Sequence, residues 1–243
     1  MNLFHLPFRS PAEQLASDEA LLEIAESGGG GEALLFWEPW ETFVVVGYAN
    51  QVSTEVNVPE CEKRGIAIYR RCSGGGTVVQ MPGGLNYSLI LRISDAPAWQ
   101  NISATNRFIM ARNCAAIAAI APSQFPQGFS VRGHTDLCAG DLKFAGNSQR
   151  RRKDYLLFHG TLLLQCDLSL IEELLLMPSQ QPEYRGRRSH LEFVTNLGLP
   201  ADAIKTALAK AWQAEGELAN PPLEKIQTLA REKYSTRDWN YKS

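Results

Sequence analysis

A glycine-rich segment beside two arginines is the first place where this sequence could perform chemistry. Residues 70–76 read RRCSGGG, a spacing that matches neither a Walker loop nor a dinucleotide-binding fingerprint. The successive glycines Gly74, Gly75 and Gly76 would let the backbone approach a ligand closely and turn its N–H groups toward an anion. Arg71 adds a fixed fork of donors that suits a carboxylate or a phosphate. A glycine-rich turn with two solvated arginines is the plainer alternative.

A carboxylate and a lysine form the second candidate group. Asp136 stands at the expected start of a strand, where it could hold Mg²⁺ against phosphate oxygens. Lys143 is flanked by Leu142 and Phe144, so it could place one cation in a partly apolar slot. The alternative is an ordinary strand lysine that points into water.

One histidine and two basic runs complete the candidates. His159 lies in an apolar run, where histidine is more often a core or rim residue, and nothing in the sequence pairs it with a nucleophile. Residues 150–153 read RRRK, and Arg185, Arg187 and Arg188 follow later. These runs could dock an acidic partner or phosphates, or they could form solvated faces. Nucleic-acid binding is not expected, because neither run is interleaved with aromatic residues and the formal net charge is -2.

The composition predicts one globular unit. The chain has 243 residues, of which 44% are apolar and 21% charged, enough for one sizeable core. Neither a basic leader nor an apolar stretch of about 20 residues is present, so we expect a cytoplasmic protein without a membrane partner. The scattered cysteines show no Cys-x-x-Cys spacing, which argues against a disulfide framework or a zinc cluster and favours reduced, buried thiols. They are Cys61, Cys72, Cys114, Cys138 and Cys166.

The elements that would position these residues can be placed from periodicity and turn signals. A capping box at Ser10 predicts a helix to about Ser27. Two short apolar runs, 33–39 and 41–48, are typical of a hairpin-like strand pair. The runs 66–71, 77–81 and 85–93 continue the strand pattern, and we expect them in one sheet.

The second half of the chain adds helices around this sheet. An alanine-rich helix over 101–121 should cover one sheet face. Residues 136–146 predict a hairpin that turns at 139–141, and residues 156–165 predict a buried strand. Two amphipathic helices follow, one around Ile204 to Trp212 and one around Leu223 to Ala230. We therefore expect a single α+β domain over 1–243, with a mixed, largely antiparallel sheet flanked by helices and residues 198–243 as a helical C-terminal extension.

Taken in order, these segments resemble the lipoate-protein ligase A family, part of the biotin/lipoyl protein ligase superfamily. RRCSGGGTVVQMPGGLNYSLIL is similar to the family's lipoate-binding segment, and DLCAGDLKFAGNSQ is similar to its Asp-Leu … Lys-x-x-Gly segment. HGTLLLQCDLS resembles the strand that follows, and MPSQQPEYRGRRSHLEFVTNL resembles the end of the catalytic domain. The resemblance covers most of residues 30–197.

The resemblance implies a role for each matching position. Asp136 would lie by the ATP phosphates and Mg²⁺, and Gly146 would also contact ATP. Lys143 would contact both the acyl carboxylate and the α-phosphate, which favours the functional interpretation of this lysine. The residues implied to line the lipoyl pocket are Arg71, Ser73, Gly74, Gly75, Gly76 and Asn86.

The implied reaction is ATP-dependent attachment of lipoate or octanoate to a lysine of a carrier protein, through lipoyl-AMP. The implied carriers are the glycine-cleavage H protein or the lipoyl domains of 2-oxoacid dehydrogenases, docked partly through residues 150–153. A biotin ligase is less expected, because RRCS rather than a Gly-Arg-Gly-Arg arrangement precedes the glycines.

Two other activities stay open on the same fold. The first is an ATP-independent octanoyl or lipoyl transferase that uses a cysteine thioester. Its nucleophile is expected upstream of the Asp-Leu pair, where Phe129 and Ser130 stand, and neither Cys72 nor Cys138 matches that place. The second is one subunit of a two-protein ligase, because the short stretch after Leu197 leaves little room for the accessory domain of longer family members.

Overall fold

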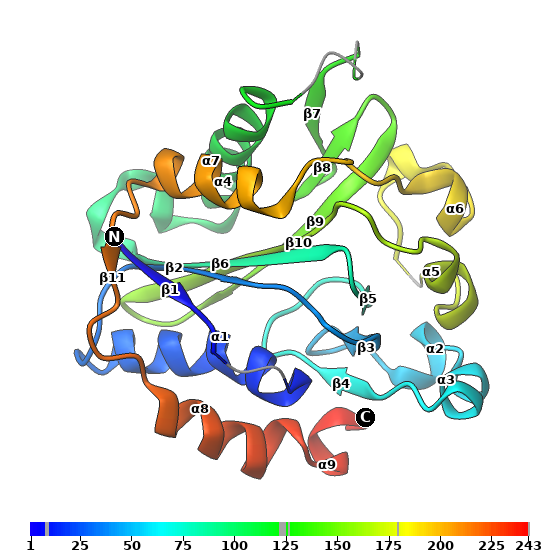
Figure 1. Ribbon diagram of the computed structural model, residues 1–243, viewed down its shortest axis with the longest axis horizontal. Helices are drawn as coiled ribbons and strands as arrows, with labels where there is room; N and C mark the ends of the chain where they lie inside the picture. Colours follow the sequence, from blue (N-terminus) through cyan, green and yellow to red (C-terminus); the bar gives the residue numbers. More distant parts are fainter. Residues whose placement is uncertain (8–9, 122–124, 126, 179, 243) are drawn as a thin grey trace.

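The computed structural model describes residues 1–7, 10–121, 125, 127–178 and 180–242. Within these residues the chain forms one large sheet and one small sheet with helices around them (Figure 1). The large sheet is antiparallel except where β1 pairs in parallel with β2 and β11. Its strands are, in spatial order, β11 (Gly216–Glu217), β1 (Asn2–His5), β2 (Ala33–Trp37), β6 (Gly84–Arg92), β10 (Tyr155–Leu163), β9 (Leu142–Arg151), β8 (Asp136–Ala139) and β7 (Phe129–Arg132). The predicted α+β class with a mixed, largely antiparallel sheet is confirmed.

The small sheet corrects two predictions about strand pairing. It contains β4 (Ile68–Arg70), β3 (Phe43–Val46) and β5 (Val78–Gln80) in that order. The predicted hairpin of β2 with β3 is wrong, because β2 pairs with β1 and β6 in the large sheet while β3 pairs with β4 and β5. The prediction that β4, β5 and β6 share one sheet is wrong for the same reason. Apolar β-branched runs identify buried strands, but they carry no information on which strand lies beside which.

Helices cover both faces of the large sheet. On one face α4 and α7 pack over an apolar cluster that includes Ile109, Met110 and Leu208, and on the other face α1 packs against α8 (Figure 1). The small sheet packs against the short helices around residues 52–64 and 169–174. The helices of the described residues are α1 (Pro11–Glu26), α2 (Val52–Glu55), α3 (Val58–Arg64), α4 (Ile102–Ala118), α5 (Ser169–Leu174), α6 (His190–Phe193), α7 (Ala201–Trp212), α8 (Leu223–Leu229) and α9 (Arg237–Asn240). No helix in these parts of the chain has the length and apolarity needed to cross a bilayer.

Helix α1 begins where its sequence signal predicts and carries polar residues into the interior. The Ser10 hydroxyl accepts a hydrogen bond from the Glu13 amide at 3.3 Å, which caps the first turn. Most of the helix is buried, and the buried residues include the acidic Asp18 and Glu19. Burying a carboxylate lowers the stability of the fold unless the carboxylate has hydrogen-bond or ionic partners. The partners of Asp18 and Glu19 are therefore of interest for function.

Candidate active site

A cavity of about 870 Å³ opens between the two sheets. Strands β3 and β5 of the small sheet supply one wall, and β6, β9 and β10 of the large sheet supply the other. The sequence-predicted site residues therefore come together at this cavity except for Ser73, which is 1% exposed and does not line it. Those that line the cavity are Arg71, Gly74, Gly75, Gly76, Asn86, Asp136, Lys143 and Gly146.

Lys143 is fixed by a carboxylate at one end of this cavity. Its Nζ lies 2.7 Å from Oδ1 of Asp136 on the neighbouring strand β8. A Cβ atom at Gly146 would lie 2.8 Å from Lys143 Nζ, so any other residue there would require the lysine ammonium to shift from this position. The other carboxylate oxygen, Asp136 Oδ2, accepts a hydrogen bond from the Tyr184 hydroxyl at 2.7 Å. Asp136 therefore has two donors and holds Lys143 in one place.

Tyr184 is a site residue that sequence reasoning missed. It lies in the segment EYR, and nothing in its spacing connects it with Asp136, 48 residues earlier in the chain. Burial and the adjacent negative charge of Asp136 raise its pKa far above the ordinary value for tyrosine. The hydroxyl thus stays protonated at neutral pH and remains a donor to the carboxylate.

The glycine-rich loop is organised from inside by Arg71. Its Nη2 donates to the carbonyl oxygens of Gly74 at 2.5 Å and Gly76 at 2.7 Å, and its Nε donates to the Ser73 hydroxyl at 3.1 Å. Burial lowers the pKa of Arg71 to about 10. The alternative of two solvated arginines is wrong, because Arg70 is 0% and Arg71 is 8% exposed.

Close approach of two backbone segments explains why residue 47 is a glycine. Gly75 has a φ of +86°, and its carbonyl oxygen lies 2.1 Å from the position that a Cβ atom would take at Gly47. Any side chain at Gly47 would collide with the glycine-rich loop. The loop and the end of β3 are consequently held in direct contact.

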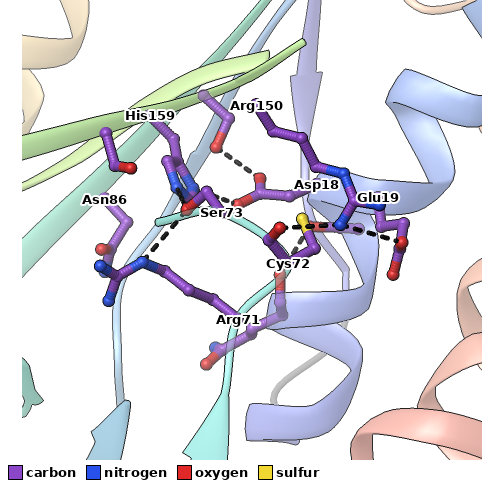
Figure 2. Close-up of polar contacts among 12 residues, drawn as sticks. Asp18, Glu19, Arg71, Cys72, Ser73, Asn86, Arg150 and His159 are labelled. Carbon is purple, nitrogen blue, oxygen red and sulfur yellow. Dashed lines mark hydrogen bonds and ion pairs between the residues drawn. The ribbon is translucent and has the colours of Figure 1, made fainter. Parts of the chain in front are cut away.

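A chain of hydrogen bonds closes the other end of the cavity, beside α1 (Figure 2). His159 Nδ1 lies 2.5 Å from Asp18 Oδ2, and His159 Nε2 lies 2.5 Å from the Ser73 hydroxyl. The Asp18 carboxylate also accepts a hydrogen bond from the Ser88 hydroxyl at 2.5 Å. Because a carboxylate only accepts, Nδ1 carries the proton in this arrangement.

The Ser73–His159–Asp18 chain has the residue types of a hydrolytic triad but not the accessibility. Ser73 is 1% exposed, and its hydroxyl is already engaged by Arg71 and His159. A nucleophile must be able to reach a substrate carbonyl. Asp18 and His159 of this chain therefore form a polar part of the cavity wall, and Ser73 does not line the cavity. Sequence reasoning missed Asp18, which lies 141 residues before His159.

A second buried hydrogen-bond chain reaches the lysine end of the cavity through the apolar core. Trp212 Nε1 donates to Asn113 at 2.7 Å, Asn113 donates to the Tyr87 hydroxyl at 2.8 Å, and Tyr87 donates to Asn147 at 2.7 Å. Asn147 then donates to the carbonyl of Thr135 at 2.7 Å, next to Asp136 in the chain. This relay fixes the backbone from which the Asp136 carboxylate projects.

The cysteines do not contribute to the lining of the cavity. None of the five lines it, and all except the half-buried Cys114 are buried. Burial raises the pKa of each thiol, to about 12 for Cys72 and about 11 for Cys166, and it also raises that of Cys138. Phe129 and Ser130, where the resemblance places a transferase nucleophile, lie on β7 and do not line the cavity.

Asp136 is the carboxylate that the structure places beside Lys143. Among the residues that the structure describes, no group of three or more His, Cys, Asp or Glu side chains could hold a metal. Mg²⁺ is usually held by one or two carboxylates together with substrate phosphates and waters, rather than by an all-protein cage. Asp136 fits that limited role.

The predicted docking run is largely engaged within the molecule. Arg150 donates to the carbonyl of Cys72 at 2.7 Å and lies 3.5 Å from Glu19, while Arg151 donates to a carbonyl beside α4. Arg152 lies 3.7 Å from Glu23 of α1. Only Lys153 has no such contact among those described. The side-chain contacts give no support to a docking role for Arg150 and Arg151.

Comparison with known proteins adds the family context. Residues 10–212 match the family model of the lipoyl protein ligase A/B catalytic domain. Lipoate-protein ligase A subunit 1 of Thermoplasma acidophilum is 27% identical over 240 residues, covering 93% of this chain and 90% of that protein. An octanoyltransferase LipM of Carboxydothermus hydrogenoformans is also 27% identical, over 96% of this chain and 95% of its own length. A solved T. acidophilum structure with bound lipoic acid has a TM-score of 0.78 at 23% identity, covering 99% of this chain and 97% of that one, and therefore the same fold.

Proposed function

The chain belongs to the lipoyl protein ligase A/B catalytic domain family, and on that premise we propose that it attaches lipoate or octanoate to a lysine of a lipoyl carrier protein, using ATP. The observation that carries the proposal is the lysine end of the cavity. Lys143 provides a fixed cation there, whereas none of the five cysteines lines the cavity.

In the first proposed step, the acyl carboxylate attacks the α-phosphorus of ATP. A carbon–oxygen–phosphorus anhydride forms, the bond between the α- and β-phosphates breaks, and pyrophosphate leaves. Charge gathers on the α-phosphate and the carboxylate oxygens in the transition state. The ammonium of Lys143, already held by Asp136 at 2.7 Å, is positioned to stabilise that charge.

In the second step, the amine of the carrier lysine attacks the carbonyl of the acyl adenylate. An amide forms, AMP leaves with the electron pair of the anhydride bond, and the amine loses one proton. Lys143 can again stabilise the oxyanion that develops at the carbonyl. No covalent intermediate with the protein is needed, which agrees with buried thiols whose pKa values are raised.

The remaining site residues take their proposed roles from their positions in the cavity. Asn86 and the glycine-rich loop would line the acyl chain, with Arg71 and Ser73 shaping that loop. Asp136 and Gly146 would lie at the ATP end, and Asp136 would hold Mg²⁺, which neutralises phosphate charge when bound. We also propose residues 1–243 as a single catalytic unit in which 198–243 form a helical extension.

A cysteine-dependent octanoyltransferase is the second candidate, because LipM of C. hydrogenoformans aligns over nearly its whole length. Such an enzyme needs a thiolate at the acyl carbonyl. The described thiols do not meet that need, which is why we favour the ligase. A third possibility, one subunit of a two-protein ligase, draws on the similarity to a ligase subunit.

One intact-mass assay separates these candidates. The protein is incubated with lipoate, ATP, Mg²⁺ and an apo carrier domain, and the carrier mass is measured with and without ATP. We expect a lipoyl mass gain only with ATP. Gain without ATP from an octanoyl carrier would favour the transferase, and gain that requires an added lysate fraction would favour the two-protein ligase.

A further inference from the structure

Arg70, the last residue of β4, is a buried cation without an acidic partner in the contacts of the described residues. It is 0% exposed, and burial lowers the pKa of its guanidinium. A buried charge destabilises a protein unless its donors are satisfied. The contacts that satisfy Arg70 should therefore reveal what the residue does.

Within the part of the chain that the structure describes, the guanidinium donates only to backbone carbonyls. These carbonyls come from two segments that are far apart in sequence. One set follows β3 and accepts from Nη1: Gly47 at 2.9 Å, Tyr48 at 3.1 Å and Asn50 at 2.6 Å. The other set, in the last residues described, accepts from Nε or Nη2: Trp239 at 3.0 Å, Asn240 at 3.2 Å and Lys242 at 2.9 Å.

The backbone of Arg70 strengthens the second connection. Its N–H donates to Asn240 Oδ1 at 2.9 Å, and its carbonyl accepts from Trp239 Nε1 at 2.8 Å. The Lys242 ammonium lies 3.3 Å from the centre of the Tyr48 ring, so the two segments also touch each other. Figure 1 shows α9 lying beside β4. Residues 234–242, here called the tail segment, are thus fastened to the small sheet.

The segment after β3 is in turn part of the cavity wall. Ala49 and Asn50 line the cavity. The Tyr48 amide donates to the Ser73 carbonyl at 2.8 Å, and the Asn50 side chain donates to the Gly75 carbonyl at 3.1 Å. A continuous set of hydrogen bonds therefore runs from the tail segment through Arg70 to the glycine-rich loop.

We propose that Arg70 and the tail segment position the wall of the acyl-binding cavity. Arg70 is a positioning residue, because its guanidinium donates to backbone carbonyls of the described residues and Arg70 does not line the cavity. The identity of the ligand in this proposal rests on the proposed function. The effect of Arg70 on the two loops does not, because it can be measured without any ligand.

The test compares Arg70→Lys and Trp239→Phe with the wild-type protein. Lysine keeps the charge but cannot reach both sets of carbonyls, and phenylalanine keeps the ring but removes the donor to the Arg70 carbonyl. Arg231→Lys is the matched control, because Arg231 is an exposed arginine of the same C-terminal region. Amide hydrogen exchange at residues 47–50 and 73–76 is followed first, and lipoate and ATP affinities are measured next.

We expect exchange at these two loops to quicken by about tenfold in Arg70→Lys, and less in Trp239→Phe, while the sheet core keeps its protection. We also expect lipoate affinity to fall by about tenfold, with ATP affinity within about twofold of the wild type. The control should match the wild type in all measurements.

Unchanged exchange at both loops, or an increase spread evenly over the protein, would overturn the inference. Should Arg70→Lys fail to fold, the loop exchange of Trp239→Phe decides the matter alone. If the wild-type protein binds no lipoate, the proposed function fails, but the loop exchange still supports or overturns the positioning role.

Discussion

At the scale of single residues, the proposed chemistry depends most on Lys143. Replacing it with alanine removes the ammonium that we propose at the reacting oxygens. We expect Lys143→Ala to slow formation of the acyl adenylate by a factor on the order of 10² or more. Lipoate-dependent exchange of pyrophosphate into ATP measures this step directly, and Lys153→Ala serves as the exposed-lysine control. If Lys143→Ala exchanged pyrophosphate into ATP as fast as the wild type, Lys143 would not be the residue that stabilises adenylate formation.

The cysteines allow the ligase and the transferase to be told apart. We expect Cys72→Ser and Cys138→Ser to keep most of the activity, because both thiols are buried and their pKa values are raised. The measurement is carrier acylation with and without ATP, together with a mass search for a hydroxylamine-labile adduct. Transfer that needs no ATP and disappears in either variant would replace the ligase by a thioester mechanism.

Tyr184 should act through Asp136. Tyr184→Phe removes the hydroxyl that donates to Asp136 at 2.7 Å and keeps the ring packed beside Phe193. A hydrogen bond to a charged group contributes about 1.5–3 kcal/mol, so we expect adenylate formation to slow by roughly tenfold or more. Kinetics at varied ATP concentrations check this, with thermal stability as the control. A variant with wild-type kinetics would reduce Tyr184 to a packing residue.

Residue types predicted part of this site, but not the partners that complete it. Lys143, Asp136 and the glycines lie in compact segments whose types and spacing can be recognised. Asp18 and Tyr184 were missed because no sequence motif surrounds them. Asp18 lies 141 residues from its partner His159, and Tyr184 lies 48 residues from its partner Asp136. Contacts of this kind depend on how elements pack, which local periodicity does not encode.

At the scale of elements, the same limit explains the two corrected strand pairings. The strands β2 and β3 were both foreseen from apolar β-branched runs, and the segment between them suggested a turn. Each strand is buried along its whole length, so neither shows the alternation that would reveal an exposed face or a preferred neighbour. The predicted hairpin of β8 with β9 is confirmed. Its sequence signal was the glycine at position 140, which adopts a φ of +57° in the short turn.

The relay through the core offers a prediction about element packing. Tyr87→Phe removes one hydroxyl and leaves the buried amide of Asn113 and the half-buried amide of Asn147 each without one partner. An unsatisfied buried polar group costs about 1–3 kcal/mol, so we expect the free energy of unfolding to fall by about that much. Urea unfolding measures the loss, and Tyr241→Phe, at a half-exposed tyrosine, is the control. A loss no greater than that of the control would show that the relay adds nothing.

At the scale of the whole molecule, Glu19 connects α1 with the C-terminal helices. Lys233 donates to its carboxylate at 2.6 Å and Tyr234 at 2.9 Å. Burial would raise the pKa of Glu19, but Lys233, with Tyr234 and Arg150, lowers it below the ordinary value of 4.5. A lowered pKa in the folded state gives stability that is complete above the unfolded pKa and is lost as the pH falls through the folded one.

We therefore expect the melting temperature of the wild-type protein to drop as the pH is lowered from about 6 to about 3, partly through Glu19. Glu19→Gln should melt lower at pH 6 and lose less than the wild type between these two values. Melting curves at several pH values test the difference in slope. Parallel curves for the two proteins would show that Glu19 does not couple the helices through its charge.

The contact between Arg70 and Lys242 also has a consequence for biosynthesis, since the two residues are 172 positions apart. A ribosome that adds about 5–20 residues per second needs on the order of 10–30 s to travel from one to the other. During that interval the guanidinium of Arg70 has only three of its six carbonyl acceptors, those that follow β3. We therefore expect the hydrogen bonds that connect this wall of the cavity to α9 to form only after residues 239–242 have been synthesised.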